Sequence, residues 1–396
     1  MRNIIISTVL FLFTVMSFIS CSEEGEDVND INKQTILVYM PWSGNDTDNG
    51  LYPYFINNLD SIEKAINSTN GLSGSRVVVL LSTSSNTASL YEILWNKNSG
   101  ITHSVINTYN GNINTREAIE HVINDTRNAA PALNYAMIIG GHGTGWINKS
   151  DWQAYPDNTK KISLFKNTRY FGSISNNDYA IDIDDLAAAI ENCNVKMQYI
   201  LFDNCYMANA ETAYCLRNST NFMVASSSEI MAVGMPYYSM WSSLCNATPS
   251  YSGMTSNFKS FYSDYAIPCG TLTAIDCRQM ENLAAVMKKI NSTYSLQKGL
   301  ADSIQSTDGF KQHIFYDLGS YVTALNPGRE LLREYNDVMS KTIRSNAATD
   351  SLYSNLYGKD VFIRIKNNSG ITISDPSIHP AALRGMRKTA WWTATH

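Results

Sequence analysis

The chain has few charged residues, and it lacks the motifs of several large enzyme classes. Lysine, arginine, aspartate and glutamate together make up 16% of its 396 residues, and the formal net charge is −5. No run of basic residues indicates a nucleic-acid surface. The sequence has no P-loop or GxGxxG motif opening a helix, no HExxH motif and no GxSxG motif. These absences argue against nucleotide-binding enzymes, zinc peptidases and serine hydrolases of the α/β type.

Cysteine is present, but its spacing indicates no metal or redox site. The seven cysteines form no CxxC pair. Cys193, Cys215 and Cys277 lie in apolar surroundings that are typical of buried free thiols. A disulfide is compatible with an oxidising compartment, but the spacing assigns none. Two further cysteines, Cys21 and Cys205, lie in contexts that suggest specific roles.

The first 20 residues are typical of a secretory signal peptide. Arg2 gives a positive start, residues 4–19 form an almost uncharged apolar run, and Ser20 precedes Cys21. A small residue directly before a cysteine suggests a lipoprotein, in which Cys21 becomes the lipid-bearing N-terminus. The acidic, polar residues 22–27 are then typical of a flexible tether. The alternative is simple secretion, with no role for Cys21.

Strand-like apolar runs alternate with helical patterns through much of the remaining chain. We expect strands at residues 35–40, 76–81, 90–95, 135–139, 199–202, 222–225, 271–275 and 361–365. We expect helices at residues 54–66, 114–128 and 208–217, another that opens at Asp182, and mostly helical structure over residues 254–345. Either Thr115 or Asn114 caps the second helix. The alternation favours an α/β fold with a mostly parallel sheet covered by helices on both faces.

This pattern divides the chain into four parts. Residues 1–20 are the signal peptide, and residues 21–33 are the lipidated acidic tether. Residues 34–240 hold the alternating strands and helices of the core, and residues 241–396 form either an extension of that core or a helical subdomain. A long polar stretch at residues 148–180 interrupts the core, and a loop of that length inside a compact domain is usually functional or disordered.

Two segments that follow apolar strands carry the candidate chemistry. His142 lies in a glycine-rich turn after residues 136–139, and Cys205 follows residues 199–202. These are the two parts that a thiol peptidase needs, because the imidazole takes the thiol proton and the thiolate attacks a carbonyl. Two neighbouring parallel strands would bring both side chains to the same edge of the sheet. The alternatives are a structural histidine in a tight turn and a buried, inert cysteine.

Residues beside these two suggest further roles. The backbone N–H groups of Gly143 and Cys205 are candidates for an oxyanion hole. Asp203 precedes Cys205 by two residues, so both point to the same face of an extended segment. A carboxylate there could bind a lysine or arginine side chain of a substrate. The alternative for Asp203 is an aspartate that ends the strand and caps the next helix.

The segments HGTGW at residues 142–146 and FDNCYMA at residues 202–208 resemble the clostripain family of cysteine peptidases. The resemblance implies a caspase-like three-layer sandwich, with a mostly parallel central sheet flanked by helices and extra C-terminal helical layers. It also implies that His142 and Cys205 form a catalytic dyad. Asp203 matches the acidic floor of a pocket that prefers arginine or lysine before the scissile bond, and residues 226–229 resemble the loop that lines the other side of that pocket.

The resemblance further implies a zymogen that cuts itself between the dyad residues. The candidate cleavage sites are the basic residues of the intervening loop, Lys149, Lys160, Lys161, Lys166 and Arg169. The chemistry needs no cofactor and no metal, although some family members depend on calcium. We expect protein or peptide partners with arginine or lysine before the scissile bond, no nucleic-acid partner, and a monomer that self-processing divides into two fragments.

The acidic stretch after Cys21 is similar to the surface-export tethers of Bacteroidetes lipoproteins. The expected location is therefore the bacterial cell envelope, with a lipid anchor at the outer membrane or cell surface. One alternative is a catalytically inactive peptidase-like lipoprotein that binds protein or glycan, with Trp391 and Trp392 as a candidate aromatic platform. Another is a caspase-like peptidase with a different specificity, such as cleavage after asparagine, if Asp203 does not reach the pocket floor.

Overall fold

The computed structural model describes residues 32–45, 47–153, 171–173, 176–297, 299–355 and 360–396. The expectations for the signal peptide and Cys21 lie outside these residues, as does the tether up to residue 31. So do four of the candidate cleavage sites, Lys160, Lys161, Lys166 and Arg169. Within the described ranges, no helix is both long enough and apolar enough to cross a membrane.

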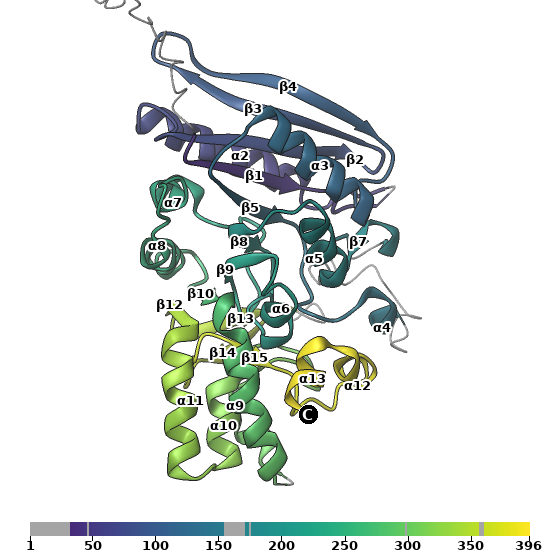
Figure 1. Cartoon of the computed structure of the whole chain (residues 1–396), viewed down its shortest axis with the longest axis vertical. Helices are drawn as coiled ribbons and strands as arrows, with labels where there is room; N and C mark the ends of the chain where they lie inside the picture. Colours follow the sequence, from purple (N-terminus) through teal and green to yellow (C-terminus); the bar gives the residue numbers. More distant parts are fainter. Residues whose placement is uncertain (1–31, 46, 154–170, 174–175, 298, 356–359) are drawn as a thin grey trace, which may run out of the picture. The chain divides into compact units, whose positions relative to one another are not determined.

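A nine-stranded mixed sheet forms the centre of the described structure (Figure 1). Its strands are β1 (Gln34–Met40), β2 (Ser75–Ser84), β3 (Thr87–Asn96), β4 (Gly100–Asn110), β5 (Asn134–Gly140), β8 (Met197–Asp203), β9 (Thr220–Ala225), β10 (Thr271–Asp276) and β12 (Ile343–Ala348). Their spatial order is β12-β10-β9-β8-β5-β1-β2-β3-β4. The central strands from β9 to β2 run parallel, whereas β3, β4, β10 and β12 add antiparallel edges.

The parallel strands are buried on both faces, which explains their continuous apolar sequences. All seven residues of β1 are buried. Its odd-numbered positions Leu37 and Tyr39 belong to one apolar cluster, and its even-numbered positions, such as Ile36 and Val38, belong to the other. Because successive side chains of a strand point to opposite faces, the sheet separates two hydrophobic cores.

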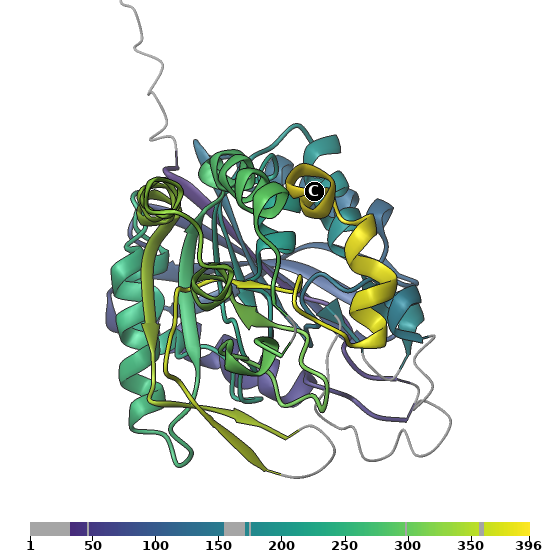
Figure 2. The same cartoon turned by 90° about the horizontal axis from the view of Figure 1, so that it is seen from below.

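Helices cover both faces of the sheet (Figure 2). One face packs against α2 (Tyr52–Ser68), α7 (Tyr237–Leu244), α8 (Tyr251–Ser263) and α12 (Pro380–Gly385). The other face packs against α3 (Arg116–Ala129), α5 (Ile183–Asn192), α6 (Ala210–Cys215), α9 (Met280–Thr293), α10 (Leu318–Leu325), α11 (Arg329–Thr342) and α13 (Ala390–Thr395). This three-layer arrangement confirms the expected α/β class.

Short elements complete the described chain around the C-terminal ends of the parallel strands. They are α4 (Lys149–Gln153), β6 (Phe171–Gly172), β7 (Ala180–Ile181), β11 (Tyr316–Asp317), β13 (Ser351–Ser354), β14 (Val361–Arg364) and β15 (Thr372–Ile373). β6 pairs with β7, β11 with β15, and β13 with β14. The part of the chain beyond residue 240 thus supplies two strands of the main sheet, β10 and β12, together with helices of the same two cores.

Local signals explain several boundaries. The hydroxyl of Thr115 accepts the N–H of Ala118 at 3.2 Å, so Thr115 rather than Asn114 caps α3. Two strands that the sequence analysis did not predict, β4 and β12, lie at the two edges of the sheet. β4 has no buried residue, so it has no apolar pattern to detect. β12 begins at Ile343, inside the stretch expected to be helical, because it pairs with β10 there.

The six cysteines within the described ranges are all free thiols. Cys193 and Cys277 are buried, as expected. Cys215 is half-buried, and its thiol donates a hydrogen bond to Asp184 at 3.0 Å.

Candidate active site

The turns that follow β5 and β8 lie in direct contact. The two strands pair in parallel with Gly140 opposite Asp203, so His142 and Cys205 each lie two residues beyond this pair. The side-chain amide of Asn204 donates a hydrogen bond to the carbonyl oxygen of His142 at 3.1 Å. The topology therefore brings the two motifs to the same edge of the sheet, as their strand contexts predict.

Gly143 allows this close approach. A Cβ atom at this position would lie 2.5 Å from the carbonyl oxygen of Cys205 and 3.1 Å from its backbone nitrogen. Any side chain would push the two turns apart. The backbone of Gly143 therefore lies against the backbone of Cys205.

The turn that carries Cys205 is held by a third segment of the chain. Tyr206 adopts a left-handed backbone conformation with φ of 60°, and its N–H donates to the carbonyl oxygen of Ser228 at 3.0 Å. Its hydroxyl donates to the carboxylate of Glu229 at 2.7 Å. The N–H of Ile230 points at the sulfur of Cys205, with a nitrogen–sulfur distance of 2.6 Å. A donor directed at sulfur stabilises negative charge on it.

Both side chains of the candidate dyad are buried. Cys205 is 0% exposed and His142 is 4% exposed. The turn of His142 is anchored further along by Trp146, whose indole N–H donates to the hydroxyl of Ser374 at 2.8 Å. The N–H of Ser374 in turn donates to Glu211 on α6, at 2.9 Å. This network connects the histidine turn, the helix that follows Cys205 and the C-terminal segment.

Asp203 lies at the end of β8 among residues of the α2 and α7 layer. The hydroxyl of Tyr237 donates to its Oδ2 atom at 2.9 Å, and the amide of Asn58 donates to the same atom at 3.4 Å. Asp203 does not cap the helix that follows, because Asn209 accepts the N–H of Thr212 and is the cap of α6. The structure thus excludes the capping alternative and leaves a carboxylate on the same side of the sheet as Cys205.

Gly234 completes the surroundings of Asp203. Its φ of 75° is left-handed, and a Cβ atom here would lie 2.5 Å from Oδ2 of Asp203. The hydroxyl of Tyr262 donates to the carbonyl oxygen of Gly234 at 2.7 Å and holds this backbone in place. Asn58, Gly234 and Tyr237 were not among the site residues predicted from the sequence. No local motif marks them, because they reach Asp203 from distant parts of the chain.

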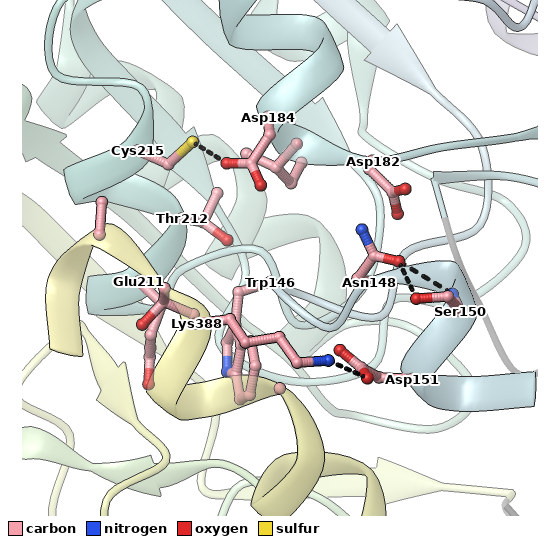
Figure 3. Close-up of a pocket in the computed structure, with 14 residues that line it drawn as sticks. Trp146, Asn148, Ser150, Asp151, Asp182, Asp184, Glu211, Thr212, Cys215 and Lys388 are labelled. Carbon is pink, nitrogen blue, oxygen red and sulfur yellow. Dashed lines mark hydrogen bonds and ion pairs between the residues drawn. The ribbon is translucent and has the colours of Figure 1, made fainter. Parts of the chain in front are cut away.

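A polar cavity of about 210 Å³ is lined in part by Trp146 (Figure 3). Asp182, Asp184, Thr212 and Lys388 contribute to its lining, which among the described residues includes neither His142 nor Cys205. Cys215 also lines this cavity, but burial and then Asp184 raise the pKa of its thiol. A thiol that keeps its proton is a poor nucleophile. Cys205, beside the histidine turn, is therefore the better candidate nucleophile.

Lys149, the one candidate cleavage site within the described ranges, begins α4. Its N–H donates to Asp182 at 2.9 Å, and its ammonium group donates to the carbonyl oxygen of Ala180 at 3.2 Å. The side chain of Asn177 donates to the carbonyl oxygen of Lys149 at 3.3 Å. The chain segments before residue 154 and after residue 175 are therefore held together by contacts among described residues.

Two other expectations concern ligands. In the described part of the chain, no group of three or more histidine, cysteine, aspartate or glutamate side chains is placed to hold a metal ion. Trp391 is buried, whereas Trp392 is half-buried and stacks on His396 with 3.6 Å between ring centroids.

Comparison with known proteins identifies the family. The sequence pattern of the clostripain family matches residues 38–375. A secreted C11 cysteine protease from Bacteroides thetaiotaomicron, iotapain, is 36% identical with a TM-score of 0.83, and the match covers 92% of this chain and 99% of that one. A clostripain from the same species in complex with a peptide inhibitor is 42% identical with a TM-score of 0.55, over 57% of this chain and 99% of that one.

An inactive zymogen C11 protease from Parabacteroides distasonis shares the fold, with a TM-score of 0.76 and 21% identity over 92% of this chain and 99% of that one. No curated protein matches the chain significantly. The family match and the 36% identical structure confirm the resemblance of the two motifs. The chain therefore belongs to the clostripain family and is a cysteine peptidase with a caspase-like α/β fold.

Proposed function

We propose that this peptidase hydrolyses peptide bonds after lysine or arginine, with Cys205 as the nucleophile and His142 as the general base. One observation carries the proposal. The turn of His142 and the turn of Cys205 touch at the carboxyl ends of two paired parallel strands, and Asp203 lies two residues before Cys205 on the same side of the sheet. A nucleophile, a base and an acidic binding group thus converge at one sheet edge.

The chemistry follows from these positions. His142 takes the proton of the Cys205 thiol, and the thiolate attacks the scissile carbonyl carbon. The N–H groups of Gly143 and Cys205 donate to the oxyanion of the tetrahedral intermediate. Collapse of this intermediate breaks the C–N bond, and His142 returns its proton to the leaving amine. Water then hydrolyses the acyl-thioester and regenerates the thiol.

Asp203 supports the preference for a basic residue before the scissile bond. It is 8% exposed at the end of β8, and a carboxylate in such surroundings binds a cationic side chain more strongly than an exposed one does. The inhibitor bound to the 42% identical clostripain carries the peptide VLTK, which ends in lysine. That inhibitor supports the same substrate class for this chain.

Self-processing is part of the proposal. The burial of Cys205 and His142 supports a form in which substrate cannot yet reach the sulfur. A cut between residues 154 and 170 would leave the contacts of Lys149 with Ala180 and Asp182 intact, so the two fragments would stay associated. Lys149 is the least suited of the five candidates, because its backbone is part of α4. We therefore favour Lys160, Lys161, Lys166 and Arg169, which lie outside the described residues.

We also propose that Cys21 anchors the exported protein to the cell envelope through a lipid. The apolar residues 4–19 and the Ser20–Cys21 junction support export and lipidation. The description of iotapain as secreted supports a location outside the cytoplasm for this chain as well.

The test compares the wild-type protein with its Cys205→Ala and His142→Ala variants on fluorogenic peptides that end in lysine, arginine or asparagine. We expect the wild type to cleave after lysine and arginine, and both variants to be inactive. Cys215→Ala is the matched control, because it removes a free thiol without touching the candidate dyad. Full turnover by Cys205→Ala would refute the assignment. Parallel assays with calcium and with a chelator test the calcium dependence that some family members have.

The same samples test self-processing on a denaturing gel. We expect the wild type to appear as two fragments that co-purify, with the break between residues 154 and 170, whereas Cys205→Ala stays whole. A wild-type protein that is intact and fully active would contradict self-processing and leave the dyad assignment standing.

A further inference from the structure

We propose that Glu229 positions the nucleophile of this peptidase. Its carboxylate holds Tyr206, the residue directly after Cys205, and thereby keeps the sulfur of Cys205 against the backbone N–H of Ile230. The proposal rests on the proposed function, in which Cys205 is the nucleophile, and it adds a residue outside the dyad. Glu229 is a positioning residue, because it acts through Tyr206 and Ile230 and not on the substrate.

Tyr206 has a backbone conformation that needs support from its surroundings. Its φ of 60° lies in the left-handed region, which residues with a bulky side chain seldom adopt. Such a conformation persists only where neighbouring contacts determine it, and it is common at functional sites. Because Tyr206 directly follows Cys205, this conformation sets the path of the chain at the candidate nucleophile.

Contacts at the backbone, the ring and the hydroxyl of Tyr206 support this conformation. Its N–H donates to the carbonyl oxygen of Ser228 at 3.0 Å, and its ring stacks on Phe315 with 5.0 Å between ring centroids. Its hydroxyl donates to Oε1 of Glu229 at 2.7 Å. A hydrogen bond to a charged acceptor is about twice as strong as one between neutral groups, so we expect the bond to Glu229 to be the stronger of these two hydrogen bonds.

Glu229 is itself fixed by the segment at the end of β13. The hydroxyl of Ser354 also donates to Oε1, and the N–H of Asn355 donates to Oε2 at 3.3 Å. Glu229 is buried. A buried carboxylate with donors on both oxygens keeps one orientation, because another orientation would leave buried charge without its hydrogen bonds. The hydroxyl of Tyr206 therefore meets a fixed acceptor.

These contacts close a ring around the sulfur of Cys205. The chain runs from Cys205 to Tyr206, whose hydroxyl reaches Glu229. Ile230 follows Glu229, and its N–H returns to the sulfur with a nitrogen–sulfur distance of 2.6 Å. Cys205 is completely buried, and burial favours the neutral thiol, whereas a donor directed at the sulfur favours the thiolate. Loss of the Glu229 side chain should therefore loosen the ring and make the thiolate harder to form.

The charge of Glu229 alone would have the opposite effect. A negative charge near the sulfur disfavours the thiolate, so its removal would make the thiolate easier to form. The direction of the change thus separates positioning from simple electrostatics. Glu229→Gln separates them further, because glutamine removes the charge but keeps an oxygen that can accept the Tyr206 hydroxyl.

The test measures the rate at which iodoacetamide alkylates Cys205 as a function of pH, with the modified peptide quantified by mass spectrometry. The thiolate is the reacting form, so the pH midpoint of the rate reports its formation. For Glu229→Ala we expect this midpoint to rise by about 1, the equivalent of one hydrogen bond to a charged group. Glu229→Gln should stay close to the wild type. Tyr206→Phe should shift the midpoint in the same direction as Glu229→Ala, and it keeps the proposal testable if the alanine variant does not fold.

Tyr214→Phe is the matched control. The Tyr214 hydroxyl donates to Glu281 at 3.0 Å, so this change removes the same kind of tyrosine–glutamate hydrogen bond outside the ring, and the midpoint should not change. An unchanged or lower midpoint in both Glu229→Ala and Tyr206→Phe would overturn the proposal. Equal shifts in Glu229→Gln and Glu229→Ala would overturn it as well.

Alkylation does not depend on turnover, so its outcome is separate from that of the peptide assays. The expected midpoints together with no cleavage after lysine or arginine would support the role of Glu229 and refute the proposed substrate class. A Cys205 that reacts no faster than Cys215 at any pH would refute both its role as nucleophile and the positioning role of Glu229. In an active enzyme, kcat/KM should fall most for Glu229→Ala and least for Glu229→Gln.

Discussion

Replacement of Glu211 by glutamine should stabilise the protein at pH 8 and change it little at pH 5. Glu211 lies on α6, is 3% exposed, and accepts the N–H of Ser374 at 2.9 Å. Burial, followed by the neighbouring carboxyl group of Asp375, raises the pKa of Glu211 to about 8. Glutamine keeps the shape of the side chain and an acceptor for Ser374, but it carries no charge at any pH.

The sign of this change in stability follows from proton linkage. A carboxyl group with a raised pKa in the folded chain binds its proton more tightly when folded, so its unfavourable effect on stability grows as the pH rises through this range. With an ordinary pKa of 4.5 and a folded pKa of about 8, that effect appears above pH 4.5 and levels off above pH 8. The destabilisation is about 1 kcal/mol at pH 5 and about 4 kcal/mol at pH 8.

The assay is thermal unfolding at pH 5 and pH 8 in the Cys205→Ala background, which avoids any self-cleavage. A gain of about 4 kcal/mol, with an unfolding entropy of about 2.1 cal/mol/K per residue, raises Tm by about 5 °C in a chain of this size. The expected rise at pH 5 is about 1 °C on the same scale. Glu117→Gln is the control, because Glu117 is exposed on α3 and should show no such difference between the two pH values.

Asp375 should also destabilise the folded protein as the pH rises, because burial raises its pKa to about 7. The stability of the wild type should therefore fall between pH 5 and pH 8, and Glu211→Gln should remove part of that fall. Equal Tm shifts for Glu211→Gln at the two pH values, or a variant that is less stable at pH 8, would refute the reasoning about this carboxyl group.

Two further predictions concern the candidate active site and the anchor. Gly143→Ala should lower kcat about a hundredfold or more, because its Cβ would lie 2.5 Å from the carbonyl oxygen of Cys205 and displace a proposed oxyanion donor; a variant with the kcat of the wild type would contradict this role. Cys21→Ala should release the protein from membranes, as measured by fractionation after high-salt washing. Retention in the membrane fraction would show that another element anchors the chain.

Much of the architecture and both candidate dyad residues could be predicted from the sequence, because their signals are local. The parallel strands are buried on both faces, so β1, β5 and β8 appear as short continuous apolar runs. The residues that follow β5 and β8 then reach the same edge of the sheet once these strands are neighbours. The cap of α3 is local as well, because Thr115 contacts a residue only three positions away.

Only the tertiary structure decided the edges of the sheet. The residues of β4 are half-buried or exposed, so their sequence lacks the apolar alternation by which a strand is recognised. The helix α11 ends at Thr342 because the chain then pairs with β10, with Ile343 opposite Ile275. Hydrogen bonds to a distant strand override the local helical preference there, since propensity differences are small compared with sheet pairing.

The surroundings of Asp203 were likewise decided by tertiary packing. The sequence alone placed Asp203 two residues before Cys205 and left open whether it capped a helix or faced a pocket. Asn58 lies 145 residues before it and Tyr237 lies 34 residues after it, and both reach it because α2 and α7 pack on one face of the sheet. Contacts between residues so far apart depend on how the layers pack, which no short segment of the sequence encodes.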